Sequence, residues 1–151
     1  MNSTFKFILI FSYLFVSFHA INSENTKSVI KNHIFQKDQV KIIEYARHPY
    51  RGITITNDNV ERAERIFKNY LHIVDPKLLN KLNLYKRQYV GIQSQGKRIV
   101  YINFAKIVSP WTQEDWEREL FFSFDGGGDY MNVKVNIDDE FCYDFSINGD
   151  A

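Results

Sequence analysis

The sequence predicts an α+β domain in which one main helix packs on a meandering antiparallel sheet of about four to five strands. The first observation behind this prediction is a single amphipathic stretch between residues 56 and 75, with apolar residues at steps of three and four. The second is a series of alternating apolar segments, separated by short polar turns, that fills the second half of the chain.

Residues 1–22 have the composition of a secretory signal peptide. Lys6 is the single cation, and a short apolar run follows it from Phe7 to Phe18. A membrane-spanning helix needs about 20 apolar residues, so this run is too short to cross a bilayer. We therefore expect a secreted or periplasmic protein that is cleaved after Ala20 or slightly later. An uncleaved membrane tether is the structural alternative.

The remainder of the chain has the size and composition of one domain. Residues 23–38 are polar without a clear period, so we expect a flexible linker there and a single domain over residues 39–151. Because only Lys6 of the 19 basic residues lies in the signal, the mature chain carries 18 basic and 18 acidic residues. This balance argues against nucleic acid as a partner. Cys142 is the only cysteine, so no internal disulfide is expected.

The main helix is predicted to begin after Thr56 and to stop at Asp75-Pro76. Thr56 suits the N-cap position, Asp58 lies in the first turn where a negative charge complements the helix dipole, and Pro76 follows the end of the helix. Before it, short extended segments are expected around Val40 and Ile53. The apolar stripe of the helix consists of Val60, Ala63, Ile66, Phe67, Tyr70, Leu71 and Ile73.

Strands are predicted for most of the chain that follows. The segments LYKRQYVGIQ and KRIVYINFAK flank Ser94-Gln95-Gly96, which predicts a hairpin. Residues 109–116 are expected to form a loop and residues 117–124 the next strand. A turn is expected at residues 138–140. In the strand after the glycines, Met131, Val133, Val135 and Ile137 are predicted to share one face. In the last strand, Phe141, Tyr143, Phe145 and Ile147 are predicted to share one face, and Cys142, Asp144 and Ser146 the opposite face.

Three consecutive glycines, Gly126–Gly128, lie between Asp125 and Asp129. A phosphate-binding loop leads into a helix, whereas the residues after these glycines alternate as a strand does. Two carboxylates are too few for a calcium loop. We therefore predict a strand-to-strand turn, with no metal and no cofactor.

Residues with catalytic chemistry do not form a recognisable motif. Cys142 would need a neighbouring base, and His33, His48 and His72 are scattered without metal-ligand spacing. The sequence therefore favours a non-enzymatic protein. The alternative is a small hydrolase that uses carboxylates around Asp125, Asp129 and Asp144, brought together from separate segments.

Charge is distributed unevenly along the chain. Residues 77–106 contain seven basic residues and no acidic residue, whereas the chain after Ile107 is predominantly acidic. This asymmetry is consistent with a surface that steers a charged partner. It is equally what basic and acidic strands produce when they pair across one sheet, and we favour this second interpretation.

Aromatic residues give the strongest indication of a binding surface. Trp111 and Trp116 flank a polar segment, and exposed aromatic rings suit the recognition of a sugar or a protein. The predicted binding residues are therefore Trp111, Trp116, Tyr101 and Tyr130. The alternative is that the tryptophans fold back and cover one end of the sheet.

The second half of the chain contains the segments YKRQYVGIQSQGKRIVYINF and FDGGGDYMNVKVNI and the final INGDA. In these segments it resembles a family of small exported bacterial proteins, chiefly from the Bacteroidetes, whose activity is not established. The resemblance implies export and one compact domain, and it implies no catalytic residue. Members often carry a cysteine after the YINF strand, where this chain has Ala105 and Lys106. The order of helix and meander is also similar in architecture to cystatin-like and lactamase-inhibitor-like domains.

The sequence thus predicts an exported, non-enzymatic domain that binds a protein or a cell-envelope component, with no nucleic acid and, after signal removal, no membrane as partner. The hydrolase is one alternative. An inhibitor or immunity partner of a secreted enzyme is another, and the charge asymmetry is its only support.

Overall fold

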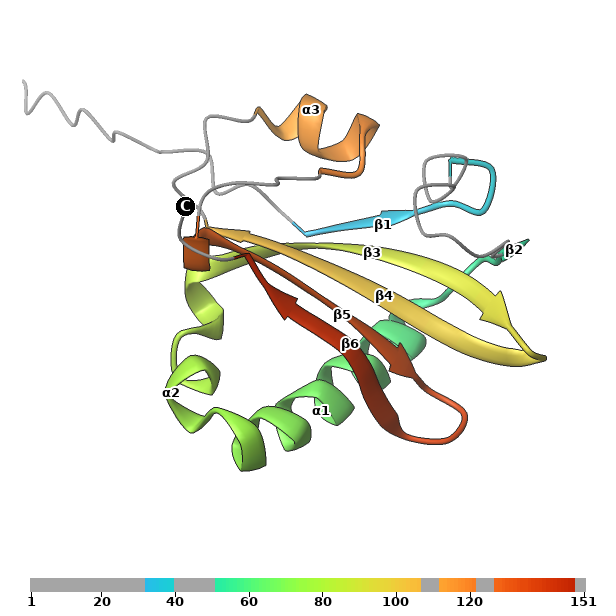
Figure 1. Ribbon diagram of the computed structural model, residues 1–151. Coiled ribbons are helices and arrows are strands. Elements are labelled where there is room, and N and C mark those ends of the chain that lie inside the picture. The colour runs from blue at the N-terminus through green and yellow to red at the C-terminus, as the bar shows by residue number, and fades with distance from the viewer. Residues whose placement is uncertain (1–31, 40–50, 107–111, 122–126, 149–151) are drawn as a thin grey trace, which may run out of the picture.

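The computed structural model describes residues 32–39, 51–106, 112–121 and 127–148 (Figure 1). Its architecture is α+β with one main helix, as the sequence predicts, whereas the open sheet has six strands and is mixed instead of wholly antiparallel. The elements are β1 (His33–Phe35), β2 (Arg51–Gly52), α1 (Asn57–Val74), α2 (Pro76–Leu79), η2 (Leu82–Leu84), β3 (Tyr85–Ser94), β4 (Lys97–Lys106), α3 (Gln113–Arg118), η3 (Gly127–Asp129), β5 (Tyr130–Asn136) and β6 (Phe141–Ile147).

The sheet has the order β1-β3-β4-β5-β6, and β2 pairs with the end of β3 beside β1. All pairings are antiparallel except that of β1, which runs parallel to β3. The sequence predicted a flexible linker up to residue 38, and this is wrong for the end of that segment, because His33–Phe35 form a strand. A segment of three residues is too short to show a period, yet its pairing with β3 buries Phe35 almost completely.

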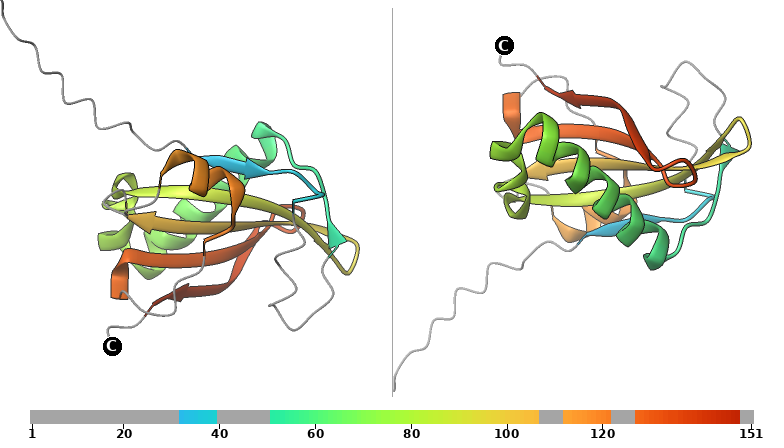
Figure 2. Two further views of the ribbon diagram at one scale, coloured as in Figure 1. Left: turned by 90° about the horizontal axis from the view of Figure 1, so that it is seen from above. Right: turned by 90° about the horizontal axis from the view of Figure 1, so that it is seen from below.

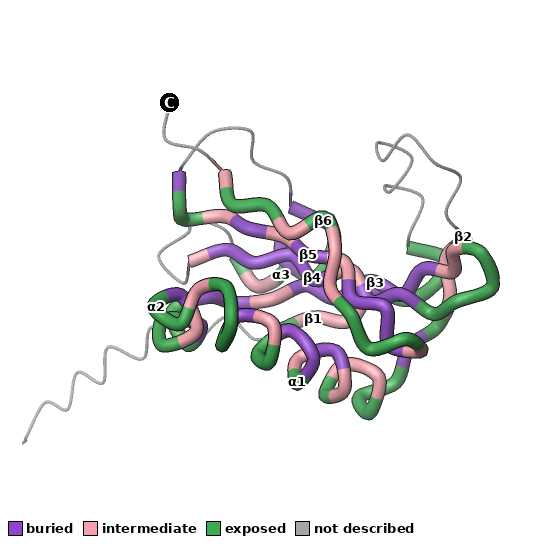
Figure 3. The backbone as a smooth tube through the Cα atoms, turned by 60° about the horizontal axis from the view of Figure 1, so that its bottom comes forward, coloured by how far each residue is buried: buried purple, intermediate pink, exposed green. Residues whose placement is uncertain are grey.

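The sheet separates two covering layers. Helix α1 crosses one face, which we call the α1 face, and α3 lies over the opposite face, the α3 face (Figure 2). Buried residues are concentrated in β3, β4 and β5, whereas β6 is mostly exposed or half-buried (Figure 3). β6 is the edge strand, paired with β5 alone among the described elements.

Helix α1 forms where the sequence predicts it. The Thr56 side chain accepts a hydrogen bond from the Asn59 N–H, and the Asn59 side chain accepts one from the Thr56 N–H, so the cap is reciprocal. The apolar stripe buries Phe67 against Phe104 of β4, with ring centroids 5.3 Å apart. The helix ends at Val74, because the Asp75 carboxylate accepts a hydrogen bond from the Leu78 N–H and so starts α2.

The hairpin between β3 and β4 has a two-residue loop, Gln95–Gly96. Both residues have positive φ, 50° and 78°, which is the backbone of a type I′ turn and explains the glycine. The turn fixes the pairing of Ser94 with Lys97 and, through it, the register of the whole ladder.

Strand β6 departs from the predicted strict alternation. The register shifts between the pairs Asn132–Ser146 and Lys134–Tyr143, and Asp144 has a φ of 49°, so β6 carries a bulge at this residue. As a result Phe145 packs with the core on the α1 face, whereas Tyr143 packs with the cluster on the α3 face. The predicted face shared by Phe141, Tyr143, Phe145 and Ile147 is therefore wrong, whereas Met131, Val133, Val135 and Ile137 are all buried in one core.

The predicted strand over residues 117–124 and loop over residues 109–116 also need correction. Residues 113–118 form α3, and no strand is present in the described residues 119–121. Gly127–Asp129 form a short 3-10 turn directly before β5, and the Tyr85 hydroxyl donates to the Gly128 carbonyl oxygen at 2.6 Å. Asp125 and Gly126 lie outside the described residues, so the strand-to-strand turn is not described in full.

Candidate functional site

Trp116 covers the sheet and does not present its ring to solvent. Thr112 and Asp115 form a reciprocal cap that starts α3, and this short helix carries Trp116 onto the sheet, where it has no exposed area. The alternative that the sequence left open, a ring folded back over the sheet, therefore describes Trp116. Trp111 lies outside the described residues.

A buried amide pair holds this covering segment in place. Gln88 Nε2 donates to the carbonyl oxygens of Trp116 and Glu119, both at 2.7 Å. Asn103 Nδ2 donates to the Phe121 carbonyl oxygen at 2.6 Å and to Gln88 Oε1 at 3.0 Å. Gln88 Oε1 also accepts from the Phe121 N–H at 2.9 Å. These bonds satisfy the backbone of a segment that has no strand partner of its own.

Lys86 lies in the same layer and is 2% exposed. Its Nζ is 4.2 Å from the centroid of the Trp116 ring and has no hydrogen-bond partner in the structure as described. Desolvation lowers the pKa of this ammonium to about 8. The aromatic face compensates part of the cost of the buried charge.

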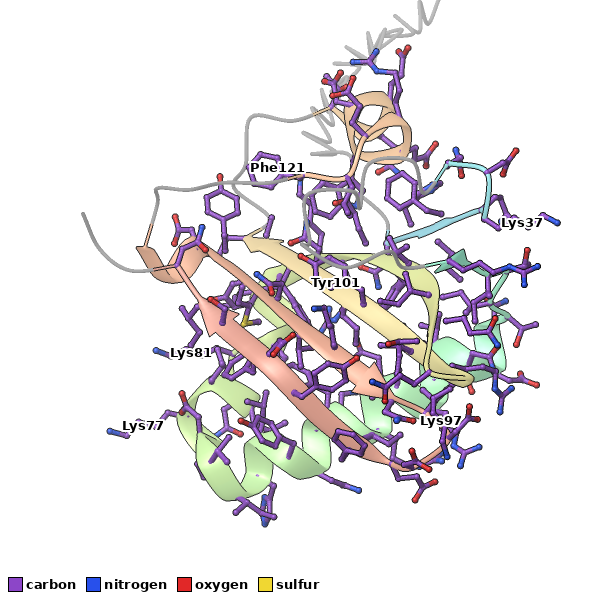
Figure 4. The ribbon with its side chains drawn as sticks, turned by 45° about the vertical axis from the view of Figure 1, so that its right-hand side comes forward. Lys37, Lys77, Lys81, Lys97, Tyr101 and Phe121 are labelled. Atoms are coloured by element: carbon purple, nitrogen blue, oxygen red, sulfur yellow. The ribbon has the colours of Figure 1, made fainter. Side chains whose placement is uncertain are left out.

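The two predicted tyrosines lie on the α3 face but are only partly exposed. Tyr130 packs its ring on Phe121 with centroids 4.8 Å apart. Tyr101 packs against the apolar cluster of β3 and β4, and desolvation raises the pKa of its hydroxyl. Figure 4 shows Tyr101 in the middle of the sheet, between Phe121 near α3 and Lys97 at the opposite end.

The carboxylates proposed for a hydrolase do not converge. Asp129 pairs with Lys106, and Asp144 pairs with Lys134 at 2.8 Å. Both carboxylates are more than half exposed. Asp129 lies in η3 before β5, whereas Asp144 lies in β6 beside Lys134, well inside the β5–β6 ladder. Asp125 lies outside the described residues.

Cys142 is also poorly suited to nucleophilic chemistry. Burial raises the pKa of its thiol to about 11, so the thiolate is scarce at neutral pH. Its side chain packs with the core on the α1 face. His33 lies in β1 and His72 is exposed on α1, whereas His48 lies outside the described residues.

Three basic residues of the segment 77–106 form ion pairs with acidic residues that follow Ile107. Lys97 pairs with Asp139 at 2.6 Å, and Arg98 with Asp138 at 2.6 Å. Lys106 pairs with Asp129 in the same way. Opposite charges thus pair between the ends of β4 and the turns before and after β5, whereas the favoured interpretation placed the acidic partners on strands.

A groove of about 800 Å³ lies at one end of the sheet, between the β3–β4 turn, the β5–β6 turn and β6. We call it the β6 groove. Its size is within the usual range for small-ligand sites. It is lined by Gln93, Ser94, Gln95, Lys97, Ile99, Asn136, Asp139, Phe141, Tyr143 and Asp144.

Aromatic side chains form the apolar part of the β6 groove. Phe141 is 48% exposed, and its ring lies 5.6 Å from that of Tyr143 at an angle of 39°. Phe141 is in register with Asn136 and Ile99, while Tyr143 is in register with Lys134 and, beyond it, Tyr101. The sequence missed this site because strict alternation assigned Phe141 and Tyr143 to the same face as the core residue Phe145. A bulge leaves no signal in hydrophobic periodicity.

The ionisable groups of the β6 groove are paired within the protein. The Asp139 carboxylate accepts from Lys97 Nζ at 2.6 Å and from Asn136 Nδ2 at 3.0 Å. Asp144 accepts from Lys134 Nζ at 2.8 Å, and this ammonium also lies 5.8 Å from the Tyr143 ring. The hydrogen bond and charge of Asp139 raise the pKa of Lys97.

A second groove of about 630 Å³ lies beside α1. At its floor, the Glu64 carboxylate accepts from the Tyr89 hydroxyl at 3.1 Å and forms an ion pair with Arg87 at 2.9 Å. Arg87 also donates to the carbonyl oxygens of Tyr85 and Leu82. Glu64, Arg87 and Tyr89 are therefore committed to one another at the floor of this groove, which Glu61, Arg65, Lys68 and Asn69 also line.

Among the described residues, no three His, Cys, Asp or Glu side chains are placed to hold a metal ion. The described helices include none with the length and apolar character needed to cross a membrane. Comparison with protein-family models, with curated proteins and with solved structures found no match to this chain.

Proposed function

We propose that this protein is an exported, non-enzymatic binding domain that acts in the cell envelope or outside the cell, and that it binds its partner in the β6 groove. The observation that carries the proposal is the half-exposed Phe141 ring beside Tyr143 in a groove of about 800 Å³. Exposure of a large apolar ring to water is unfavourable in the free protein, and such a ring is a typical anchor for a bound molecule.

The chemistry of the described residues supports binding over catalysis. General acid–base catalysis needs a titrating group near the reacting atoms, often with a shifted pKa. The acidic groups of the β6 groove are held in ion pairs, and the thiol with a raised pKa packs into the core. The inhibitor or immunity alternative has less support, because Lys97, Arg98 and Lys106 of the basic segment are paired with acidic residues of the same protein.

The proposal is tested by capture of cell-envelope extract on the immobilised full-length exported protein. The test variant is Phe141→Ser/Tyr143→Ser, and the matched control is Leu84→Ser, since Leu84 is also 48% exposed but lies outside the groove. We expect one dominant component that the Leu84→Ser protein retains and the double variant loses. Capture that is unaffected by the double variant, or no capture at all, would contradict the proposal.

A further inference from the structure

We propose that the ligand of the β6 groove is a neutral glycan, meaning an uncharged oligo- or polysaccharide. This inference rests on the proposed function and adds the chemical class of the ligand. It follows from the juxtaposition of a half-exposed Phe141 ring, backed by the partly buried Tyr143 ring, with polar groups whose charges are already compensated.

The first step concerns the apolar component. Phe141 and Tyr143 present adjacent rings with centroids 5.6 Å apart, and Phe141 keeps 48% of its surface exposed. The face of an aromatic ring is electronegative and attracts weakly positive C–H groups. A pyranose ring presents such C–H groups on one side and hydroxyls around its edge, so it can lie on a ring and still reach polar neighbours.

The second step concerns charge. Both carboxylates that line the groove are matched by a lysine, Asp139 by Lys97 and Asp144 by Lys134. The described lining therefore has no uncompensated charge to attract an ion. A charged ligand would have to displace one of these lysines or carboxylates or bring its own counterion, whereas a neutral hydroxyl can bond to either without separating the pair.

The third step concerns the polar rim. Gln93, Ser94 and Gln95 line the groove at the β3–β4 turn. Amides and hydroxyls both donate and accept hydrogen bonds, and so does every sugar hydroxyl. The type I′ turn fixes the backbone of Gln95, whose side chain is exposed to solvent.

A peptide strand added to the free edge of β6 fits the structure less well. Strand addition needs a regular row of unpaired N–H and C=O groups. The bulge at Asp144 interrupts that row in the middle of β6 and places a charged residue there, which is how edge strands avoid pairing with other chains. The observations therefore favour a glycan over an extended peptide.

The test is affinity electrophoresis of the full-length exported protein in native gels that contain soluble neutral polysaccharides, namely β-glucan, galactomannan, arabinoxylan, dextran and glycogen. We expect retardation in at least one gel. Phe141→Ser and Tyr143→Ser should each weaken that binding at least tenfold, whereas Leu84→Ser should leave it within twofold. Circular dichroism of the variants checks that each remains folded.

The salt dependence of binding separates a neutral ligand from a charged one. For the retarding polysaccharide we expect the dissociation constant to change less than twofold between 50 and 500 mM NaCl, because no ion pair forms across the interface. A tenfold weakening over this range would overturn the inference in favour of a charged partner.

The outcomes also separate this inference from the proposed function. If no gel retards the protein while groove-dependent capture of another envelope component succeeds, the glycan assignment is overturned and the binding function stands. If both experiments are negative, both are overturned. Retardation that Phe141→Ser and Tyr143→Ser leave unchanged would overturn the assignment of the β6 groove as the site.

Discussion

The two faces of the sheet are stabilised in different ways. The α1 face is covered by one long helix and buries aliphatic and aromatic side chains such as Phe67, Leu71 and Phe104. The α3 face is covered by a six-residue helix and irregular backbone, and it buries Gln88, Asn103 and Lys86 among its aromatic residues. A helix satisfies its own backbone, so it needs only apolar partners, whereas irregular chain needs buried polar side chains to satisfy it.

The largest effect is expected on the α1 face. Phe67→Ala removes a completely buried ring that contacts Phe104 and Phe145, and should reduce the free energy of unfolding by about 3–5 kcal/mol. Urea denaturation followed by circular dichroism measures this. A loss below about 1.5 kcal/mol would mean that α1 is not the main stabilising layer.

On the α3 face, Gln88→Leu should cost about 3 kcal/mol, because three backbone groups and the Asn103 amide lose their partner in a buried place. The fluorescence of Trp116 should shift to the red as the covering segment detaches. Gln93→Leu is the matched control on the same strand, since Gln93 is only half-buried, and it should change stability by less than about 0.5 kcal/mol. Equal effects of the two substitutions would contradict the role assigned to the buried amide pair.

The charge on the α3 face gives an effect that depends on pH. Lys86→Met should stabilise the protein by about 1–2 kcal/mol at pH 7, because the native state no longer holds a buried ammonium. The folded pKa of about 8 lies below the ordinary lysine pKa of 10.5, so the wild type gains stability as the pH rises from about 8 to 10.5. The advantage of Lys86→Met should therefore shrink between pH 7 and pH 9.

Urea midpoints of the wild type and Lys86→Met at both pH values measure this difference. The titrations of Cys142 and the tyrosines are common to both proteins and cancel in it. An advantage that is the same at pH 7 and pH 9 would show that Lys86 keeps its ordinary pKa, with the Trp116 ring compensating the burial fully.

The smallest effects are expected at the caps. Thr56→Ala and Thr112→Ala each remove one side-chain cap, worth about 1 kcal/mol. Helix α1 has 18 residues and a packed stripe, so it should remain protected from hydrogen exchange in Thr56→Ala. Helix α3 has six residues and should lose protection in Thr112→Ala. Equal protection of α3 in both variants would show that the buried amide pair alone holds it.

The part of the fold that could be predicted is the part encoded locally. The cap at Thr56, the stripe of α1, the turn at Gln95–Gly96 and the inward face of β5 each show as a pattern within a few residues. The strand at His33–Phe35 and the helix at Gln113–Arg118 are too short to show a period. The candidate site was predicted around Trp111, Trp116, Tyr101 and Tyr130. Trp116 is buried, and the groove that we propose as the site is lined by Phe141 and Tyr143.

The sequence by itself determined one main helix and a sheet built from hairpins, because each follows from periodicity or turn chemistry along the chain. Only the tertiary structure decided which aromatic rings are exposed. Trp116 is buried because Gln88 holds α3 on the sheet, and Tyr143 lies apart from Phe145 because a bulge at Asp144 shifts the register. Both depend on contacts between segments distant in sequence, which leave no local pattern.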